Sequence, residues 1–322
     1  MFSKILMGYN IIFILLLVHQ YNAKVVVHHN TKAIKAKKQL DNCDIFNGSW
    51  EYNDNYTPYY NTSSCPFISV EFDCQKNGRP DQLYLKYRWK PTNCVLPSFD
   101  GEDMLGRYQG KKIMFVGDSL SLQQWQSLTC MLHASVPHST YTFSNKAGIA
   151  TFYIQDYDIS VMLYPTPYLV DVVSEKMGRI VKLDSIIQGG NVWKHMDLLV
   201  FSCWHGWDNT PGWDYIQMGD KLYKNMVRLE AYKYGLTTWS NWVKNNINNK
   251  KTQVFFQNIS PTHDRSQDWN ETTITTGTCK GETTPTSGTT YPTELPRATQ
   301  VLKQVLSELS SKVTLLDITV LS

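Results

Sequence analysis

A short apolar run that ends in Gly117-Asp118-Ser119 most constrains how this chain can fold. The run, residues 113–116, has the length and composition of a strand that is buried on both faces. After the turn, apolar residues recur every three or four positions over residues 120–133, which predicts an amphipathic helix. Ser119 is therefore expected at a strand-to-helix turn, with its hydroxyl exposed at the carboxyl end of a sheet.

Such a turn has the geometry that a serine nucleophile needs in acyl transfer. The first amides of the helix and the helix dipole favour an oxyanion beside Ser119, the dipole by about 0.3–1 kcal/mol. Gly117 permits the tight turn and the close approach of a substrate. The alternative is that Gly117-Asp118-Ser119 only caps the start of the helix. A lone Gly-Asp-Ser is common, and by itself it favours this alternative.

From about Phe99 onward, strands alternate with helices, which indicates an α/β fold with a mainly parallel, doubly wound sheet. The predicted strands are residues 112–116, 150–154, 159–164, 197–202, 253–257 and 313–317, and the predicted helices are 120–133, 223–245 and 297–310. Three strands end in polar loops, at residues 117–119, 202–205 and 258–263. Ligands of such folds bind beyond the carboxyl ends of the strands, so we expect these loops, with His205 and His263, at one edge.

The N-terminus has the pattern of a targeting segment, because Lys4 precedes an apolar stretch over residues 5–18. The stretch is shorter than the roughly 20 residues of a membrane-spanning helix. Residues 1–23 are therefore predicted to be a signal peptide or a signal anchor, and the basic residues 24–41 a flexible stem. Either alternative places the rest of the chain in the secretory lumen and limits membrane contact to this segment.

Cysteine usage fits an oxidising compartment. The chain has seven cysteines, none with the spacing of a metal site, and four of them lie in the loop-rich residues 42–95. Because the number is odd, at least one cysteine lacks a partner within the chain. Glycosylation signals at Asn47, Asn55, Asn61 and Asn270 fit the same compartment, whereas a fifth, at Asn258, ends an apolar strand where burial would block it.

The amino-acid composition of the chain indicates which class of molecule it could bind. The net charge is only +3 and no basic stripe occurs along the chain, which argues against nucleic-acid binding. Aromatic residues make up 13% of the chain. Their rings can stack on sugars, but most are expected in the core.

Ten longer motifs carry a specific resemblance to a known family. They are CDIFNGSW at residues 43–50, CPFI at 65–68, KNGRPD at 76–81, YRWKP at 87–91, LPSFDG at 96–101, GDSLS at 117–121, QWQSL at 124–128, WDY at 213–215, GLTTW at 235–239 and SPTH at 260–263. From about residue 42 to its last residue, the chain resembles the plant trichome-birefringence-like family of polysaccharide O-acetyltransferases and esterases, the PC-esterases.

The resemblance implies an SGNH-hydrolase-like α/β domain over residues 96–322 and a disulfide-bonded N-terminal domain over residues 42–95. It implies transfer of acetyl groups to hydroxyls of cell-wall polysaccharides such as xylan, xyloglucan, mannan or pectin. An acetyl donor would serve as co-substrate, and neither a cofactor nor a metal is expected.

The family's site residues carry over onto matching positions of this chain. Ser119 would form an acetyl-serine, its amide and Gly117 would hold the oxyanion, and Asp118 would brace the turn. Losing one such oxyanion donor typically costs about 10²–10³ in rate. The family's pairing pattern implies the disulfides Cys43–Cys94 and Cys65–Cys130.

The chain also departs from the family pattern. The family places its catalytic Asp and His in an Asp-x-x-His motif beyond a strand like residues 313–317, and no such motif occurs up to Ser322. His205 and His263 match positions that are not the base, so we expect them to form hydrogen bonds around the site or to line the substrate cleft. Cys74 and Cys279 would pair with cysteines of the same absent segment.

A serine hydroxyl is a weak nucleophile without an adjacent base. We therefore expect a chain that ends at Ser322 to be an incomplete gene model, a splice product or a decaying paralogue, unstable or nearly inactive. Three functions stay open: a Golgi O-acetyltransferase with its catalytic domain in the lumen, a secreted polysaccharide acetyl esterase, and a catalytically dead polysaccharide-binding protein.

Overall fold

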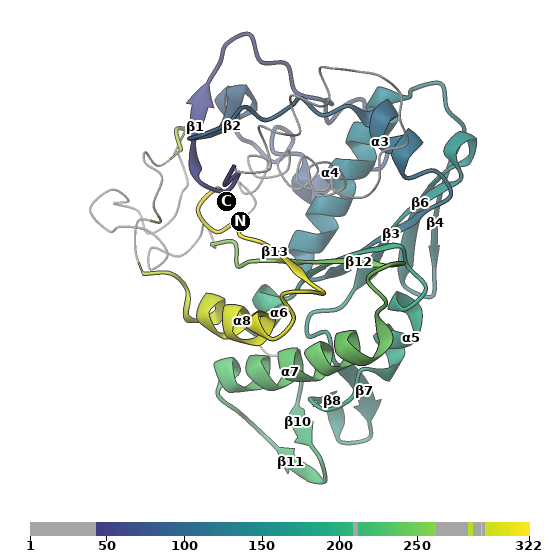
Figure 1. The fold of residues 1–322 in the computed structure, drawn as a ribbon, viewed down its shortest axis with the longest axis vertical. Helices are drawn as coiled ribbons and strands as arrows, with labels where there is room; N and C mark the ends of the chain where they lie inside the picture. Colours follow the sequence, from purple (N-terminus) through teal and green to yellow (C-terminus); the bar gives the residue numbers. More distant parts are fainter. Residues whose placement is uncertain (1–42, 209–211, 262–282, 286–290, 292–293) are drawn as a thin grey trace.

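The computed structural model describes residues 43–208, 212–261, 283–285, 291 and 294–322. A seven-stranded sheet lies at the centre of the described fold, in the order β13-β12-β9-β3-β6-β5-β4 (Figure 1). Its strands are β3 (Lys112–Gly117), β4 (Tyr141–Lys146), β5 (Ile149–Ile154), β6 (Ile159–Pro165), β9 (Leu198–Ser202), β12 (Gln253–Gln257) and β13 (Thr314–Leu316).

The five strands from β13 to β6 run parallel, and β5 and β4 extend the sheet as antiparallel strands. This confirms the α/β fold with a mainly parallel, doubly wound sheet. The chain winds outward from β3 in both directions, with β9 on one side and β6 on the other. The carboxyl end of β3 therefore lies where the strand order reverses, which is where ligands of such sheets bind.

Both faces of the central strands are buried. Successive side chains of a strand point to opposite faces, so each strand contributes to a core on either side. Ile113 and Phe115 of β3 belong to one hydrophobic core, and Met114 and Val116 belong to a second core on the other face. This explains why residues 113–116 are uniformly apolar rather than alternating with polar residues.

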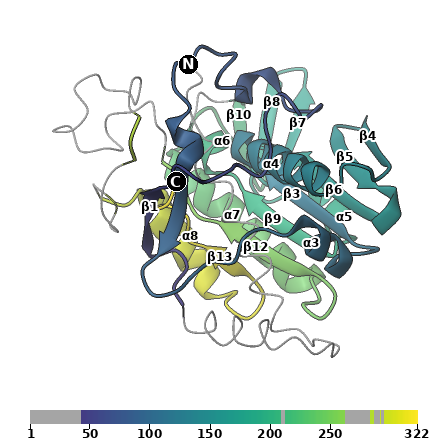
Figure 2. The same cartoon turned by 90° about the horizontal axis from the view of Figure 1, so that it is seen from above.

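Helices cover the two faces separately (Figures 1 and 2). Helices α3 (Gly101–Arg107) and α4 (Ser119–Ser135) contribute to the first core. Helices α5 (Ile187–Trp193), α7 (Arg228–Asn246) and α8 (Arg297–Ser307) contribute to the second. The short helix α6 (Trp204–Asp208) follows β9, and single 3-10 turns occur at Val70–Phe72, Leu83–Lys86 and Gln155–Tyr157.

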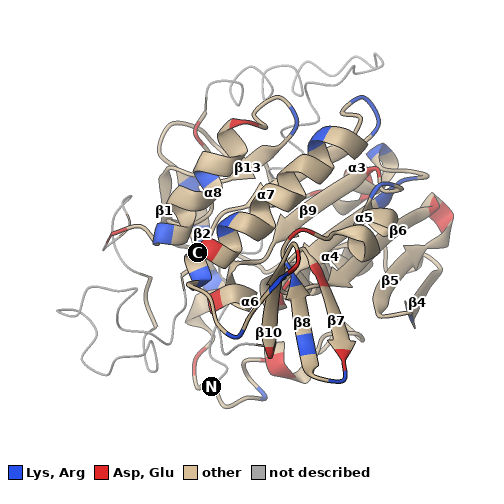
Figure 3. Cartoon of the chain, turned by 90° about the horizontal axis from the view of Figure 1, so that it is seen from below, with Lys and Arg blue, Asp and Glu red and all other residues tan. Residues whose placement is uncertain are grey.

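A smaller sheet lies beside α7 (Figure 1). Its order is β11-β10-β8-β7, built from β7 (Asp171–Glu175), β8 (Gly178–Lys182), β10 (Tyr215–Met218) and β11 (Lys221–Tyr223). Val181 and Ile216 of this sheet are buried in the same core as α7. Basic and acidic residues are interspersed over this side of the molecule (Figure 3).

The N-terminal region packs onto the α4 side of the main sheet. Strands β1 (Gly48–Tyr52) and β2 (Tyr87–Pro91) form an antiparallel pair, and Trp89 of β2 is buried in the same core as α4. The structure forms the two disulfides that the family pattern implies, Cys43–Cys94 and Cys65–Cys130. The second joins this region covalently to α4, and each closes a loop long enough to stabilise the fold by about 2–4 kcal/mol.

The predicted elements of the α/β part occur with small shifts. The six predicted strands correspond to β3, β5, β6, β9, β12 and β13, and the three predicted helices to α4, α7 and α8. Helix α7 begins at Arg228 rather than at residue 223, because residues 221–223 pair with β10 as β11 and residues 224–227 form a loop before the helix. The short strands β4, β7, β8 and β10 were not predicted, since they are only partly buried and their sequences lack a clear apolar alternation.

Several predictions concern residues outside the described ones: the targeting segment at 1–23, the stem at 24–41, His263, Asn270 and Cys279. In the part of the chain that is described, no helix combines the length and the apolar character needed to cross a membrane. Asn47, Asn55 and Asn61 are exposed, and Asn258 is buried as its position after an apolar strand indicates.

Candidate active site

Ser119 is the first residue of α4 and follows directly on β3 at the centre of the sheet. Its side chain is exposed, and its hydroxyl makes no hydrogen bond to any residue that the structure describes. The backbone amides of the first helical turn have no partner within a helix and favour a negative charge nearby. An acyl group can therefore reach the Ser119 oxygen at the position where those amides could stabilise an oxyanion.

Gly117 allows the turn to lie close to β9. A Cβ atom at this position would lie 1.6 Å from the carbonyl oxygen of Ser202 and 2.5 Å from Ser121 Oγ, and Gly117 has a φ of 154°. The Gly117 carbonyl accepts a hydrogen bond of 2.8 Å from Thr166 N–H, and Asp118 N–H donates one of 3.2 Å to the Ser202 carbonyl. The turn is thus fixed to the chain on both sides of β3.

Asp118 connects α4 to α6. One carboxylate oxygen accepts a hydrogen bond of 3.0 Å from Leu120 N–H, which caps α4, and the other accepts one of 3.3 Å from Gly206 N–H on α6. Both oxygens are occupied as acceptors of backbone amides. This agrees with the predicted role of Asp118 in bracing the turn.

Burial raises the pKa of the Asp118 carboxyl, although the nearby His205 and the backbone amides of Leu120 and Gly206 act in the opposite direction. Among the described residues, Cys203 and Tyr232 are further titratable groups that interact with it. A raised folded-state pKa means that folding favours the protonated form. The contribution to stability is therefore complete below the unfolded pKa of about 3.9 and falls as the pH rises through the folded pKa.

We predict that Asp118→Asn removes this pH dependence. The asparagine side chain keeps one oxygen that can accept from Leu120 N–H, but its NH₂ group cannot accept from Gly206 N–H. The variant should therefore be less stable than the wild type at low pH. As the pH rises from about 4, the wild type should lose stability relative to the variant, because only the wild-type carboxyl ionises. Urea unfolding of both proteins over a pH series measures the difference, and two parallel curves would contradict the prediction.

The carboxyl end of β9 contributes Cys203 and His205. Cys203 is buried, and burial raises the pKa of its thiol well above the usual value, so the thiol stays protonated and is not a nucleophile. His205 is half-buried on α6 beside the Asp118 carboxylate. The structure therefore brings His205 to the edge of the sheet that bears Ser119, as predicted from the strand ends.

The carboxyl ends of β12 and β13 are held together by side chains. Asn258 Nδ2 donates to Asp317 Oδ1 at 2.5 Å, and Lys303 Nζ of α8 lies 2.7 Å from Asp317 Oδ2. Gln124 of α4 donates to Gln257 at the end of β12. Asp317 thus links β12, β13 and α8.

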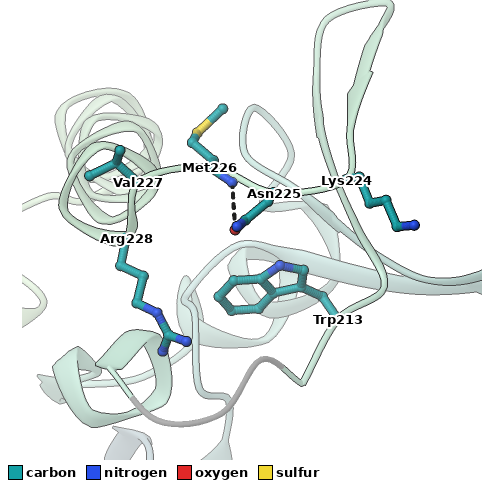
Figure 4. Close-up of a pocket in the computed structure, with 6 residues that line it drawn as sticks. All are labelled: Trp213, Lys224, Asn225, Met226, Val227 and Arg228. Carbon is teal, nitrogen blue, oxygen red and sulfur yellow. Dashed lines mark hydrogen bonds between the residues drawn. The ribbon is translucent and has the colours of Figure 1, made fainter.

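The structure adds one feature that the sequence did not identify, a pocket lined by Trp213 and by residues 224–228 (Figure 4). Residues 224–227 fell within the predicted helix 223–245, so the loop that they form was missed. The signal that could have found it was Trp213, an aromatic residue in a polar loop. Within the described residues, no cluster of three or more His, Cys, Asp or Glu side chains could hold a metal ion.

Comparison with known families gives two matches that together span most of the chain. The family described as the GDSL/SGNH-like acyl-esterase family found in Pmr5 and Cas1p, or PC-esterase, matches residues 96–322. The PMR5 N-terminal domain matches residues 41–95.

Curated relatives from Arabidopsis thaliana are similar over most of this chain. Protein trichome birefringence-like 38 is 47% identical over 89% of this chain and 76% of the relative. Protein trichome birefringence-like 41 is 50% identical over 88% of this chain and 79% of the relative. Protein trichome birefringence is 36% identical over 88% of this chain and 48% of the relative.

Proposed function

The chain belongs to the GDSL/SGNH-like acyl-esterase family, the PC-esterases, and on that premise we propose that it acetylates cell-wall polysaccharide through an acetyl-serine on Ser119. The relatives are trichome birefringence-like proteins, which agrees with the resemblance that the sequence motifs indicated. Hydrolysis or transfer of an acyl group is the chemistry common to this proposal and to the family's description.

The proposal rests on the position of Ser119. It is exposed, it begins α4 beyond the central strand of the sheet, and its turn is held by Gly117 and by both oxygens of Asp118. A nucleophile placed on rigid elements in this way needs little reorganisation during the reaction.

The reaction would proceed in two steps. In the first, the Ser119 oxygen bonds to the carbonyl carbon of the donor's acetyl group, the bond from acetyl to donor breaks, and the serine proton leaves with the donor's leaving group. In the second, a sugar hydroxyl attacks the acetyl-serine, the acetylated sugar forms, and the hydroxyl proton returns to Ser119. The family pattern assigns the base that relays these protons to an Asp-x-x-His motif, and no cofactor takes part.

Hydrolysis is a second candidate, favoured by the description of the matched family as acyl esterases. The same acetyl-serine would then react with water, and an acetylated polysaccharide would be the donor. The two candidates differ only in the acceptor of the second step.

The proposal can be tested by trapping the acetyl-serine in the full chain. After brief exposure to p-nitrophenyl acetate and an acid quench, mass spectrometry should find one acetyl group on Ser119, and none there in Ser119→Ala. De-acetylated oligosaccharide should then speed the loss of the acetyl group and appear acetylated, whereas an esterase releases acetate at the same rate with or without it. Acetylation confined to other residues would contradict both candidates.

The compartment follows from the same proposal. Both disulfides suit an oxidising environment. We place the catalytic domain in the Golgi lumen, with secretion to the cell wall as the alternative, where polysaccharide and an acetyl donor are its partners and nucleic acid is not.

A further inference from the structure

Strand β4 forms one edge of the seven-stranded sheet and lies at the periphery of the molecule (Figures 1 and 2). Its neighbour in the sheet is β5, with which it forms an antiparallel hairpin. Within the part of the chain that the structure describes, no strand pairs with the outer edge of β4. An edge of this kind offers unpaired N–H and C=O groups to a further strand.

The pairing with β5 determines which backbone groups of β4 face outward. Gln155 N–H donates a hydrogen bond of 2.9 Å to the Thr140 carbonyl, one step beyond the opposed pair Tyr141 and Ile154. In an antiparallel pair, hydrogen-bonded and non-hydrogen-bonded positions alternate along the strand. The even-numbered residues of β4 therefore bond to β5, whereas the odd-numbered residues direct their N–H and C=O groups away from the sheet.

The hairpin turn holds this edge in a regular, extended form. Two residues join β4 to β5, Ala147 with a φ of 51° and Gly148 with a φ of 80°. Left-handed φ at both positions is typical of the hairpin turn whose twist matches that of the paired strands. A further strand can therefore be added without first ordering the edge, which lowers the entropic cost of association.

The side chains of β4 leave the middle of this edge open. Natural edge strands are usually protected from pairing by charged residues or proline. In β4 the charged side chain is Lys146, at the end of the strand, whereas Phe143 in the middle is 46% exposed. The Phe143 ring stacks on Phe67, with centroids 5.8 Å apart, and lies 5.5 Å from the ring of Trp125. An ordered aromatic side chain is thus presented beside the outward-facing backbone groups.

The two ends of the edge carry opposite charges. Lys146 is exposed at the end of β4. At the beginning of the strand, the exposed Asp156 accepts a hydrogen bond of 3.2 Å from Thr140 N–H. A second copy that pairs in the antiparallel direction brings opposite charges together at both ends, whereas parallel pairing brings like charges together. The edge is therefore complementary to itself in one orientation.

One antiparallel register combines these features. It places Phe143 of one copy opposite Phe143 of the other. Each outward-facing residue then lies opposite an outward-facing residue, and each such pair exchanges two backbone hydrogen bonds. In the same register Lys146 lies opposite Thr140, so it is beside the residue that Asp156 of the other copy binds.

We propose that two copies of this chain associate through β4, in antiparallel orientation, and form one continuous sheet. A second copy suits this edge better than an unrelated strand, because the charges at its two ends complement each other when the strand meets itself. The contact is related by a twofold axis and closes at the dimer. The edge lies three strand spacings, about 14 Å, from β3, so Ser119 stays accessible in both copies.

The oligomeric state of the full chain tests the proposal, independently of the reaction proposed for Ser119. A contact made by one strand belongs with the weak interfaces, which bury less than about 1,200 Å². Sedimentation velocity over a range of about 1–100 µM should therefore show a monomer that converts to a dimer as the concentration rises. A protein that stays monomeric at about 100 µM would overturn the proposal.

Asn145→Pro should block the edge while sparing the fold. The Asn145 N–H faces outward, so proline removes a bond to the second copy but none to β5, and proline is tolerated at such positions of edge strands. The variant should stay monomeric over the same range, with a midpoint of urea unfolding close to that of the wild type. A folded Asn145→Pro protein that dimerises as well as the wild type would show that the contact lies elsewhere.

Exchange of charges tests the orientation without proline. Lys146→Glu places like charges at both ends and should weaken dimerisation about tenfold at low salt, and Asp156→Lys should do the same. In a mixture of the two variants, the mixed dimer has opposite charges at both ends again, so it should form with nearly wild-type affinity. Failure of the mixture to recover this affinity would reject the antiparallel register.

Lys176→Glu is the matched control for these charge changes. Lys176 is an exposed lysine in the turn between β7 and β8, on the smaller sheet. Its replacement changes the net charge as Lys146→Glu does but leaves the β4 edge intact, so the affinity of the dimer should not change. An equal loss of affinity in Lys176→Glu would indicate diffuse attraction between charges rather than pairing through β4.

Discussion

Replacing Ser119 by alanine should abolish acetyl transfer while leaving the fold intact. In enzymes that keep their catalytic base, loss of the serine nucleophile lowers kcat by about 10⁴-fold or more. Because we expect a chain without the Asp-x-x-His motif to be nearly inactive, the loss measured in this chain should be smaller and should end at the uncatalysed rate. Ser119 is exposed and has no hydrogen bond to a described residue, so stability should change by no more than about 0.5 kcal/mol. Release of p-nitrophenol from p-nitrophenyl acetate, with urea unfolding of the same samples, measures both quantities.

Ser121 provides the matched control within the same motif. Only 1% of Ser121 is exposed, and its Oγ has no hydrogen-bond partner in the described part of the chain. Ser121→Ala removes a buried hydroxyl that is not satisfied there, so stability should stay the same or rise, and the rate should change little. A large loss of rate in Ser121→Ala with an active Ser119→Ala would reject the assignment of the nucleophile.

Replacing Gly117 by alanine should destabilise the whole sheet at its centre. The added methyl group would lie 1.6 Å from the backbone oxygen of Ser202, a contact that side-chain rotation cannot relieve. The ends of β3 and β9 must separate, which also weakens the 3.2 Å hydrogen bond from Asp118 N–H to Ser202. We expect a loss of about 3 kcal/mol or more, together with most of the activity, because Ser119 moves with the turn.

Gly106→Ala is the corresponding control. Gly106 lies within α3, and a Cβ atom there would have no neighbour within 4 Å. Alanine favours a helix over glycine by about 0.5–1 kcal/mol, so this variant should be slightly more stable. The urea concentration at the midpoint of unfolding, measured for both variants, tests this prediction. A Gly117→Ala protein as stable as Gly106→Ala would show that the turn tolerates a side chain.

Much of the fold could be predicted because its signals are local. Residues 113–116 indicate a buried strand by composition, and the spacing of apolar residues over 120–133 indicates a helix, without knowledge of any distant residue. The second sheet was missed for the opposite reason. Its strands are short, and each is stabilised by partners elsewhere in the chain, as β10 is by β8.

For the site, the sequence by itself determined the position of the proposed nucleophile, a serine between a strand and a helix, and the family motifs that surround it. Only the tertiary structure decided what holds that serine. The contacts of Asp118 with Gly206, 88 residues away, and of Gly117 with Ser202 depend on β3 and β9 becoming neighbours in the sheet. The pocket likewise forms only where Trp213 meets residues 224–228. Local propensities act over a few residues, whereas these contacts arise from the order in which distant strands pair, which no short stretch of sequence specifies.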